Sequence, residues 1–414
     1  MSINSARYFS CRTFFLCQRI RQNTFGGPNK LLSAQKVSYV NRNAFLQRCN
    51  FQQKKSYQTI SSINLEEKNI VKSPCKELVL PFNVSLPEFV WEQGIKYNRT
   101  NVALINGVTE KSYTYEEGYR ECKKFAISLN KLRIGKADVV ALFMPNCPEY
   151  ILCLLGTFGI GAVATTINPN YTAHEVSKQF LASNTKLVVT IPNLINIVKD
   201  AIKKIDFDIK VVVLGEEGEH DCGQYQSYKE LMSNFQNGEE QEFAFERDTW
   251  DEVALLPYSS GTTGLPKGVI LTTKNLVSNV YQNVYGQELN FIKLATDTFQ
   301  PKIICVLPMF HIFGLLVTSL PTLRAEGQVI TIPKFESNLF ANTLETFKPT
   351  FLHLVPPLVA FCASNEAVTP RHLESVEHIM VILDLQILTE NTSYRDYKHN
   401  YVKLISKHSF GANA

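Results

Sequence analysis

Two hydrophobic periodicities alternate along the middle of the chain. Short apolar runs predict buried strands, whereas apolar residues recurring every three or four positions predict amphipathic helices. The first strands are expected at 139–143, 162–167, 187–190 and 211–214. Helices are expected between them at 148–155, 172–183 and 194–205. This alternation is typical of an α/β domain with a largely parallel sheet that helices cover on both faces.

A second α/β series begins at Asp251. Its strands are expected at 253–256, 268–271, 303–307 and 328–332, and its helices at 274–285 and 338–346. Between the two series, residues 218–242 are polar, acidic and rich in Gln and Asn, so we expect a surface excursion there. Thr172 and Glu175 fit a capping box, in which the hydroxyl and the carboxylate satisfy the free amides of a helix start.

Residues 150–171 carry no charge, and this length raises the question of a membrane span. Gly156, Gly159, Gly161 and Pro169 divide the stretch into shorter pieces. We therefore predict a buried helix followed by a buried strand, and no transmembrane segment.

Charge separates the beginning of the chain from the rest. The chain has 414 residues, of which 45% are apolar, enough for a substantial core, and its formal charge is +4. Ten Lys or Arg residues precede the first acidic side chain, Glu66. This composition, with a basic amphipathic helix expected near residues 9–20, is typical of a mitochondrial transit peptide.

A disordered basic tail that binds acidic surfaces is the alternative for this segment. Peroxisomal and cytosolic locations also stay open, although the final Gly-Ala-Asn-Ala is not a peroxisomal signal of the Ser-Lys-Leu type. The ten cysteines are scattered, with no C-x-x-C pair, which argues against a zinc site or a disulfide scaffold and favours free thiols. We predict no metal-ligating residue and no nucleic-acid partner.

Residues 258–268 carry the candidate chemistry. They read Tyr-Ser-Ser-Gly-Thr-Thr-Gly-Leu-Pro-Lys-Gly, between two apolar runs. Glycines let backbone amides approach an anion, hydroxyls donate hydrogen bonds, and the lysine adds a mobile positive charge. The segment therefore predicts a phosphate-binding loop.

Two other interpretations of this loop are weaker. A P-loop requires G-x-x-x-x-G-K-[ST], but Lys267 is followed by Gly268, and a β-prone segment follows where a P-loop would enter a helix. A flexible linker is disfavoured because apolar strands flank the loop. We predict a strand, loop, strand unit, with the next helix beginning near Thr273.

Three more motifs occur in order around the loop: Asn-Pro-Asn-Tyr-Thr-Ala-His-Glu at 168–175, Leu-Pro-Met-Phe-His-Ile-Phe-Gly at 307–314 and Leu-Val-Pro-Pro at 354–357. With them, the chain resembles the acyl- and aryl-adenylate-forming ligase superfamily, the AMP-dependent synthetases and ligases. Within it, the chain is most similar to 4-coumarate-CoA ligases and firefly luciferase-like acyl-CoA synthetases. The resemblance implies an N-terminal ligase domain at 66–381, between a presequence-like segment at 1–65 and a divergent tail at 382–414.

The function implied by this resemblance is that of an ATP-dependent carboxylate-CoA ligase. Such an enzyme converts a fatty or aromatic acid and ATP into an acyl-adenylate and pyrophosphate, and then forms the acyl-CoA. ATP with Mg²⁺ and coenzyme A are therefore the expected cofactor and co-substrates.

The resemblance also assigns roles to residues. Pyrophosphate contacts fall on Ser259, Ser260, Gly261, Thr262, Thr263, Gly264 and Lys267. Lys267 and His311 are the catalytic candidates, and His311, Phe313 and Gly314 would line the acyl pocket. Phe313 stands where many hydroxycinnamate ligases have a tyrosine, which favours an apolar acyl group. His353, His372 and His378 lie in no catalytic pattern and are interpreted as ordinary polar or core residues.

From Ile382 onward the sequence departs from the family pattern. It contains no Gly-Tyr-Gly-Met-Thr-Glu motif, no ribose-binding Thr-Gly-Asp and no C-terminal lid. We therefore expect an incomplete N-terminal domain, weakened ATP binding and an exposed sheet edge after 376–381. The alternative hypothesis is a non-catalytic pseudoenzyme or splice fragment that acts through protein interaction, for example with a full-length sibling. Luciferase-type oxygenation of an adenylate is a third.

Overall fold

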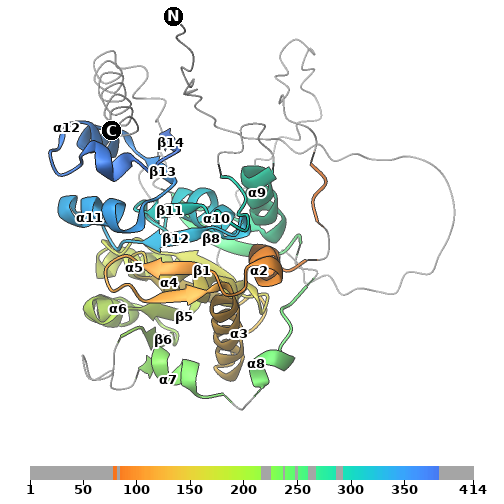
Figure 1. Cartoon of the computed structure of the whole chain (residues 1–414). Helices are drawn as coiled ribbons and strands as arrows, with labels where there is room; N and C mark the ends of the chain where they lie inside the picture. Colours follow the sequence, from red (N-terminus) through yellow and green to blue (C-terminus); the bar gives the residue numbers. More distant parts are fainter. Residues whose placement is uncertain are drawn as a thin grey trace, which may run out of the picture.

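Two sheets with helices between and around them form the structure (Figure 1). The computed structural model describes residues 78–81, 84–215, 225–235, 238–247, 250–259, 267–285 and 292–381. Strands within each sheet are mostly parallel, which confirms the predicted α/β class.

The first sheet contains, in spatial order, β14 (His378–Val381), β13 (Phe351–Leu354), β11 (Lys302–Cys305), β12 (Gln328–Thr331), β1 (Val102–Asn106) and β2 (Ser112–Thr114). The second contains β10 (Leu271–Thr272), β8 (Val253–Ser259), β4 (Val163–Thr166), β3 (Val139–Phe143), β5 (Thr185–Thr190), β6 (Lys210–Val213) and β7 (Gln226–Ser227), with β9 (Lys267–Gly268) also paired to β8.

The described α-helices are α2 (Leu86–Tyr97), α3 (Tyr115–Lys131), α4 (Pro148–Phe158), α5 (Ala173–Ser183), α6 (Ile195–Ile202), α7 (Tyr228–Ser233), α8 (Glu239–Glu242), α9 (Thr273–Tyr285), α10 (Leu320–Arg324), α11 (Ser337–Phe347) and α12 (Pro356–Ser364). Two short 3₁₀ segments, η3 (Pro192–Leu194) and η5 (Pro370–Leu373), and a π-helical segment, η4 (Phe313–Ser319), complete the set.

Helix α4 lies between the two sheets. It contacts β3 and β4 of one sheet and β1 of the other. Nearly all of its side chains are buried, because it is apolar on every side and has no face suited to water. Side chains from both sheets join it in one core cluster, including Leu104, Leu142 and Leu255.

The outer faces of the sheets have their own helices. On the first sheet, Ile304 points to the cluster formed with α11 and α12, whereas its neighbours Ile303 and Cys305 point to the central core. On the second sheet, α5 and α6 cover the outward side chains. This is the alternation expected of strands buried on both faces.

Most predicted strands and helices are confirmed within one to three residues at each end. Thr172 caps α5 as predicted, and Glu175 completes the capping box by accepting from the Thr172 amide at 2.8 Å. The stretch at 150–171 forms most of α4 and then β4, as expected. None of the helices in the described ranges has the length and hydropathy that a bilayer span requires.

The strand predicted at 268–271 is interrupted. The chain lies antiparallel to β8 from Lys267 to Leu271, but it is divided into β9 and β10. Between them, Val269 donates to the carbonyl of Pro257 at 2.8 Å, while Pro257 has no amide to return the bond. The missing donor breaks the ladder without changing the direction of the chain.

The prediction of a polar excursion at 218–242 is partly wrong. Within it, β7 joins the edge of the second sheet beside β6, and α7 follows directly. Met232 of α7 is buried, and Ser128 of α3 donates to the carbonyl of Leu231 at 3.2 Å. Three side chains of this segment, Tyr228, Leu231 and Met232, pack on the central core and hold the segment on the domain.

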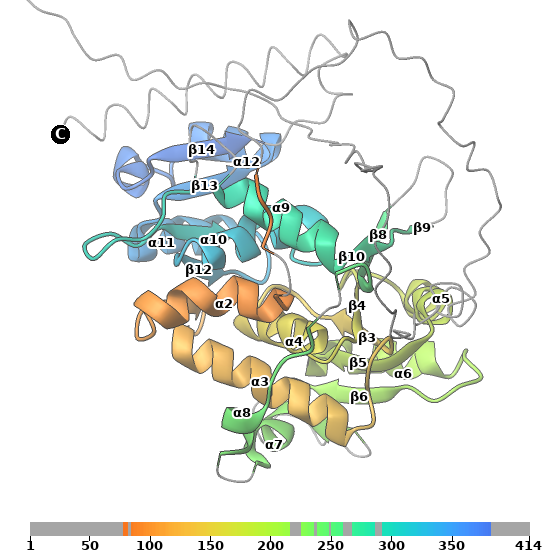
Figure 2. The ribbon, with the colours of Figure 1, turned by 90° about the vertical axis from the view of Figure 1, so that its right-hand side faces the viewer.

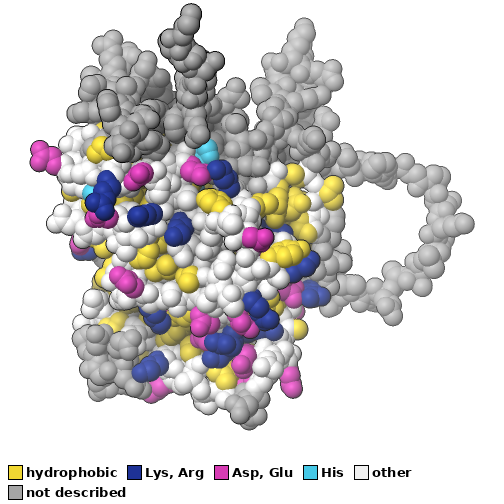
Figure 3. All heavy atoms as spheres, in the orientation of Figure 1, with side chains coloured by type: hydrophobic (Ala, Val, Ile, Leu, Met, Phe, Trp, Pro, Cys, Tyr) yellow, Lys and Arg dark blue, Asp and Glu magenta, His cyan; other side chains and the backbone are white. Residues whose placement is uncertain are grey.

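Acidic and basic side chains are interspersed on the face shown in Figure 3. Exposed pairs such as Arg99 with Glu116 at 2.9 Å contribute little to stability in water. The cysteines Cys122, Cys147, Cys153, Cys305 and Cys362 are free thiols, in agreement with the sequence interpretation for the described part of the chain. Burial raises the pKa of Cys305 to about 12.

Replacing Leu152 with alanine tests the central position of α4. Leu152 is fully buried, so Leu152→Ala should lower the free energy of unfolding by about 2–5 kcal/mol. The control is Leu181→Ala on α5, whose side chain is 42% exposed. Urea unfolding of both variants would measure this, and equal losses would contradict the placement of α4 between the sheets.

Candidate functional site

The predicted phosphate loop, residues 259–267, begins and ends on described strands. Ser259 closes β8, and Lys267 opens β9 directly opposite it in the antiparallel pair (Figure 2). Both side chains are exposed. The loop therefore leaves the carboxyl end of β8 and returns beside it, which confirms the strand, loop, strand prediction, and α9 begins at Thr273 as expected. Ser260, Gly261, Thr262, Thr263 and Gly264 lie outside the described residues.

The segment that carries His311 follows the carboxyl end of β11. We call residues 306–312 the histidine loop. Asn146, at the carboxyl end of β3 in the other sheet, holds it: the Asn146 side-chain amide donates to the carbonyls of Cys305 at 3.1 Å and Leu307 at 3.0 Å. The amide of Met309 donates to the Asn146 Oδ1 at 2.7 Å. The carboxyl ends of strands from both sheets therefore meet here.

Thr166 makes a second connection between the sheets. Its Oγ1 donates to the carbonyl of Phe310, the residue before His311, at 2.8 Å. In the sheet, Thr166 pairs with Pro257 of β8, two residues before the phosphate loop begins. The same residue thus contacts the histidine loop and the strand that leads into the phosphate loop. Ligands of parallel α/β sheets bind outside the carboxyl ends of the strands, which is where both loops lie.

The His311 side chain is exposed and carries a hydrogen-bond donor. Its Nδ1 accepts from the amide of Phe313 at 3.2 Å, so the neutral ring carries its proton on Nε2. The side chain is exposed, yet nearby protein partly desolvates the imidazole and lowers its pKa. The neutral form, with Nε2–H available, is therefore the one expected near pH 7.

Phe313 and Gly314 begin the π-helical segment η4. A Cβ on Gly314 would lie 2.2 Å from the carbonyl oxygen of Pro308, so only glycine allows this close turn. The half-buried Phe313 packs edge-on against His353, with ring centroids 5.3 Å apart. His353 is buried, and its Nδ1 is 2.8 Å from the Thr318 hydroxyl. As the sequence indicated, His353 is a core residue, and its ring contacts the ring of Phe313.

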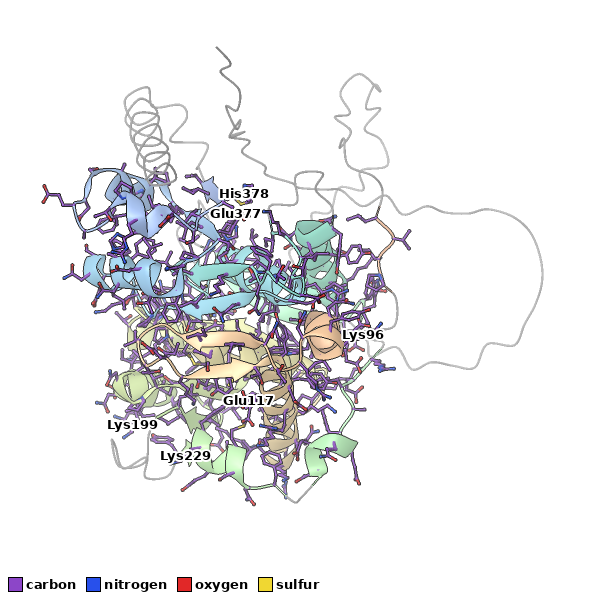
Figure 4. The ribbon with its side chains drawn as sticks, viewed as in Figure 1. Lys96, Glu117, Lys199, Lys229, Glu377 and His378 are labelled. Atoms are coloured by element: carbon purple, nitrogen blue, oxygen red, sulfur yellow. The ribbon has the colours of Figure 1, made fainter. Side chains whose placement is uncertain are left out.

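A small hollow lies elsewhere, at the amino ends of β11, β13 and β14. Glu377 and His378, which are labelled in Figure 4, line it with Lys293 and Lys302. Its free volume of about 10 Å³ is room for roughly one water molecule. It is too small for a nucleotide or an acyl group, and it lies at the opposite end of the strands from Ser259 and His311.

The described residues contain no group of three or more His, Cys, Asp or Glu side chains that could hold a metal ion.

Among the residues near the site, sequence reasoning missed Asn146 and Thr166. Asn146 had one available signal: it is a polar residue between a strand and a helix that starts with Pro148, where a side chain is often needed to bond the backbone. Nothing in the sequence singled out Thr166, since its partner is distant along the chain.

Comparison with known proteins gives a consistent picture. The family model described as AMP-binding enzyme matches residues 91–385. The chain is 36% identical over 310 residues to 4-coumarate-CoA ligase 1 of Arabidopsis thaliana, covering 74% of this chain and 54% of that protein. It is 34% identical over 325 residues to the 4-coumarate-CoA ligase of Vanilla planifolia, covering 77% and 56%. The chain spans about half the length of the curated relatives it matches.

Solved structures share the fold. A natural red-emitting luciferase from Phrixothrix hirtus superposes with a TM-score of 0.68 at 23% identity, covering 81% of this chain and 61% of that one. ATP-bound MatB from Rhodopseudomonas palustris superposes with a TM-score of 0.62 at 22% identity, covering 77% and 58%. At these identities the similarity establishes that the fold is shared.

Burial of His353 predicts a pH dependence of stability. Desolvation lowers its pKa to about 3 in the folded protein, whereas the unfolded chain binds a proton below about pH 6.5. The unfolded state therefore binds more protons between these values, and the free energy of unfolding should fall as the pH is lowered from about 6.5 toward 3. Urea unfolding across this range should show a shallower slope for His353→Gln. Parallel slopes would show that His353 is not neutral in the fold.

Proposed function

Because the chain belongs to the AMP-binding enzyme family, we propose that it carries the ATP- and carboxylate-binding part of a carboxylate-CoA ligase. The reaction joins a carboxylic acid to AMP from ATP with release of pyrophosphate, and then transfers the acyl group to coenzyme A. The observation that supports this most strongly is the position of the two loops. Thr166 pairs with Pro257 on the strand that leads into the phosphate loop, and it also bonds to Phe310 in the loop that carries His311.

Each loop has a distinct chemical task in this proposal. The hydroxyls and amides of the phosphate loop donate to phosphate oxygens, and the Lys267 ammonium stabilises negative charge on the departing pyrophosphate. ATP enters with Mg²⁺ as part of the substrate. The carboxylate must approach the α-phosphate, so a donor beside it holds the reacting oxygens in place. We assign that contact to His311, whose exposed side chain carries its proton on Nε2.

The acid is either fatty or aromatic. Relatives named 4-coumarate-CoA ligases support an aromatic or similar flat acid. Phe313, held edge-on by His353, offers an apolar ring and no hydroxyl to the acyl group, which favours an apolar substrate over a phenol.

We propose a mitochondrial location because residues 1–65 are basic and contain no Asp or Glu. A fluorescent reporter fused to these residues should be imported into mitochondria. A matched fusion in which Arg7, Arg12, Arg19 and Arg21 are replaced by glutamine should stay in the cytosol, since import depends on the basic face. Cytosolic signal from both fusions would favour the basic-tail interpretation.

Acid-dependent exchange between ATP and labelled pyrophosphate tests the proposed function directly. We expect exchange with at least one of a fatty, a benzoic or a cinnamic acid, and a loss of about 10²-fold in Lys267→Ala because a transition-state charge partner is removed. The control is Lys229→Ala on α7, which follows β7 at the edge of the second sheet, where four strands, β4, β3, β5 and β6, separate β7 from β8. Equal losses in the two variants would contradict the placement of the phosphate loop. No exchange in folded wild-type protein would favour the hypothesis of a non-catalytic chain that acts through a full-length sibling.

A further inference from the structure

We propose that Thr166 and Asn146 are positioning residues that set His311 against the phosphate loop, an inference that rests on the proposed function. Neither residue is among those that the sequence motifs assign to ATP or to the acyl group. Both are buried; Thr166 ends β4 and Asn146 follows β3, two strands of the sheet that contains β8, whereas the histidine loop follows β11 of the other sheet. They therefore connect the histidine loop to the sheet on which the phosphate loop begins and ends.

The exposed side chain of His311 cannot fix its own position. It is not packed into the core, and its one described hydrogen bond, from the Phe313 amide, is to its own loop. Its place relative to Ser259 and Lys267 therefore depends on how the backbone of the histidine loop is held. That backbone is bonded to Asn146 at Leu307 and Met309, and to Thr166 at Phe310.

Asn146 uses both ends of its side-chain amide for this purpose. The two donor bonds and one acceptor bond all go to backbone groups of residues 305–309. A buried amide whose partners all lie at the end of β11 and in the loop after it specifies the position of that segment, because a shift would leave the Asn146 side chain and the Met309 amide unpaired. Asn146 thus holds the beginning of the histidine loop.

Thr166 holds the end of that loop, and hydrogen bonds from neighbouring side chains fix the position of Thr166 and its strand. The Gln179 side chain of α5 donates to the Thr166 carbonyl and to the Thr165 hydroxyl, both at 3.0 Å. The Thr165 hydroxyl in turn donates to the carbonyl of Leu256 in β8 at 2.8 Å. A continuous set of buried hydrogen bonds thus runs from α5 through the end of β4 to β8 on one side and to Phe310 on the other.

Two substitutions at Thr166 isolate its hydroxyl. Thr166→Val keeps the shape and removes the donor to Phe310, whereas Thr166→Ser keeps the donor. The matched control is Thr190→Val at the end of β5. The buried Thr190 hydroxyl donates to the carbonyl of Phe143 at 2.9 Å, so the control loses a similar bond in the same sheet without touching the histidine loop. Asn146→Ala would remove three hydrogen bonds at once and could unfold the protein. The test of the proposal therefore uses Thr166→Val and Thr166→Ser.

The first measurement is independent of enzymatic activity. In full-length protein with ¹⁵N-labelled histidine, NMR should show the His311 ring resonances shifted in Thr166→Val, with a titration midpoint moved upward as the loop becomes more solvated. His311→Gln identifies the resonance. Thr166→Ser and Thr190→Val should retain the wild-type His311 signals, even where Thr190→Val lowers the melting temperature as much as Thr166→Val does. Unchanged His311 signals in Thr166→Val, or equal changes in Thr190→Val, would overturn the proposal.

The second measurement separates positioning from binding. If wild-type protein catalyses pyrophosphate exchange, Thr166→Val should lower kcat by about 10-fold to 10²-fold, since a small misplacement of a reacting group has effects of this size. KM for ATP should stay within about 2-fold, because the phosphate loop keeps its strand. Thr166→Ser should restore kcat. A loss confined to KM would overturn the positioning role. Absence of exchange in wild-type protein would refute the proposed function instead, and the NMR result would then decide whether Thr166 sets the position of His311.

Discussion

The burial of α4 between two sheets is the constraint on which the rest of the structure depends. A helix that is apolar on every side cannot lie on a surface, so it requires a sheet above it and a sheet below it. Each sheet then needs helices on its other face, which α11 and α12 supply on one side and α5 and α6 on the other. The layer order follows from the composition of a single segment.

Polar groups near this interior must find partners within the protein, and that requirement produces the geometry of the site. Asn146 immediately precedes the N-cap of α4, where it is shielded from water. Its three bonds to the backbone at the end of β11 and in the loop after it satisfy its own amide and, at the same time, the amide of Met309. The same bonds join the carboxyl ends of β3 and β11. One side chain therefore satisfies buried polar groups and, at the same time, connects the ends of strands from the two sheets.

The sequence predicted what local patterns determine and missed what distant contacts determine. The strand at 139–143, the capped helix α5 and the loop between β8 and β9 were correct because apolar runs, the Thr172 capping box and a dense Gly, Ser and Thr segment are local signals. The break at Val269 was missed because it depends on the partner strand having Pro257 at that level. The interval between Leu80 and Val139 gave no clear prediction, yet it contains α2 and α3, which pack on the central core and on each other. For the site, residue types were predictable, but the contacts of Thr166 and Asn146 join segments over a hundred residues apart.

The pairing of β1 with β12 has a consequence for how the protein is made. Leu104 lies beside Val329, so the first sheet cannot close until the ribosome has delivered most of the ordered chain. Helix α4 emerges long before that point, when β1, β2 and β3 have been made but β4, β8, β11 and β12 have not. Contacts of such long sequence separation slow folding and leave apolar surface exposed in the meantime. Nascent chains of this protein should therefore depend on chaperones during a defined window of synthesis, which opens when α4 leaves the ribosome and closes when β12 does.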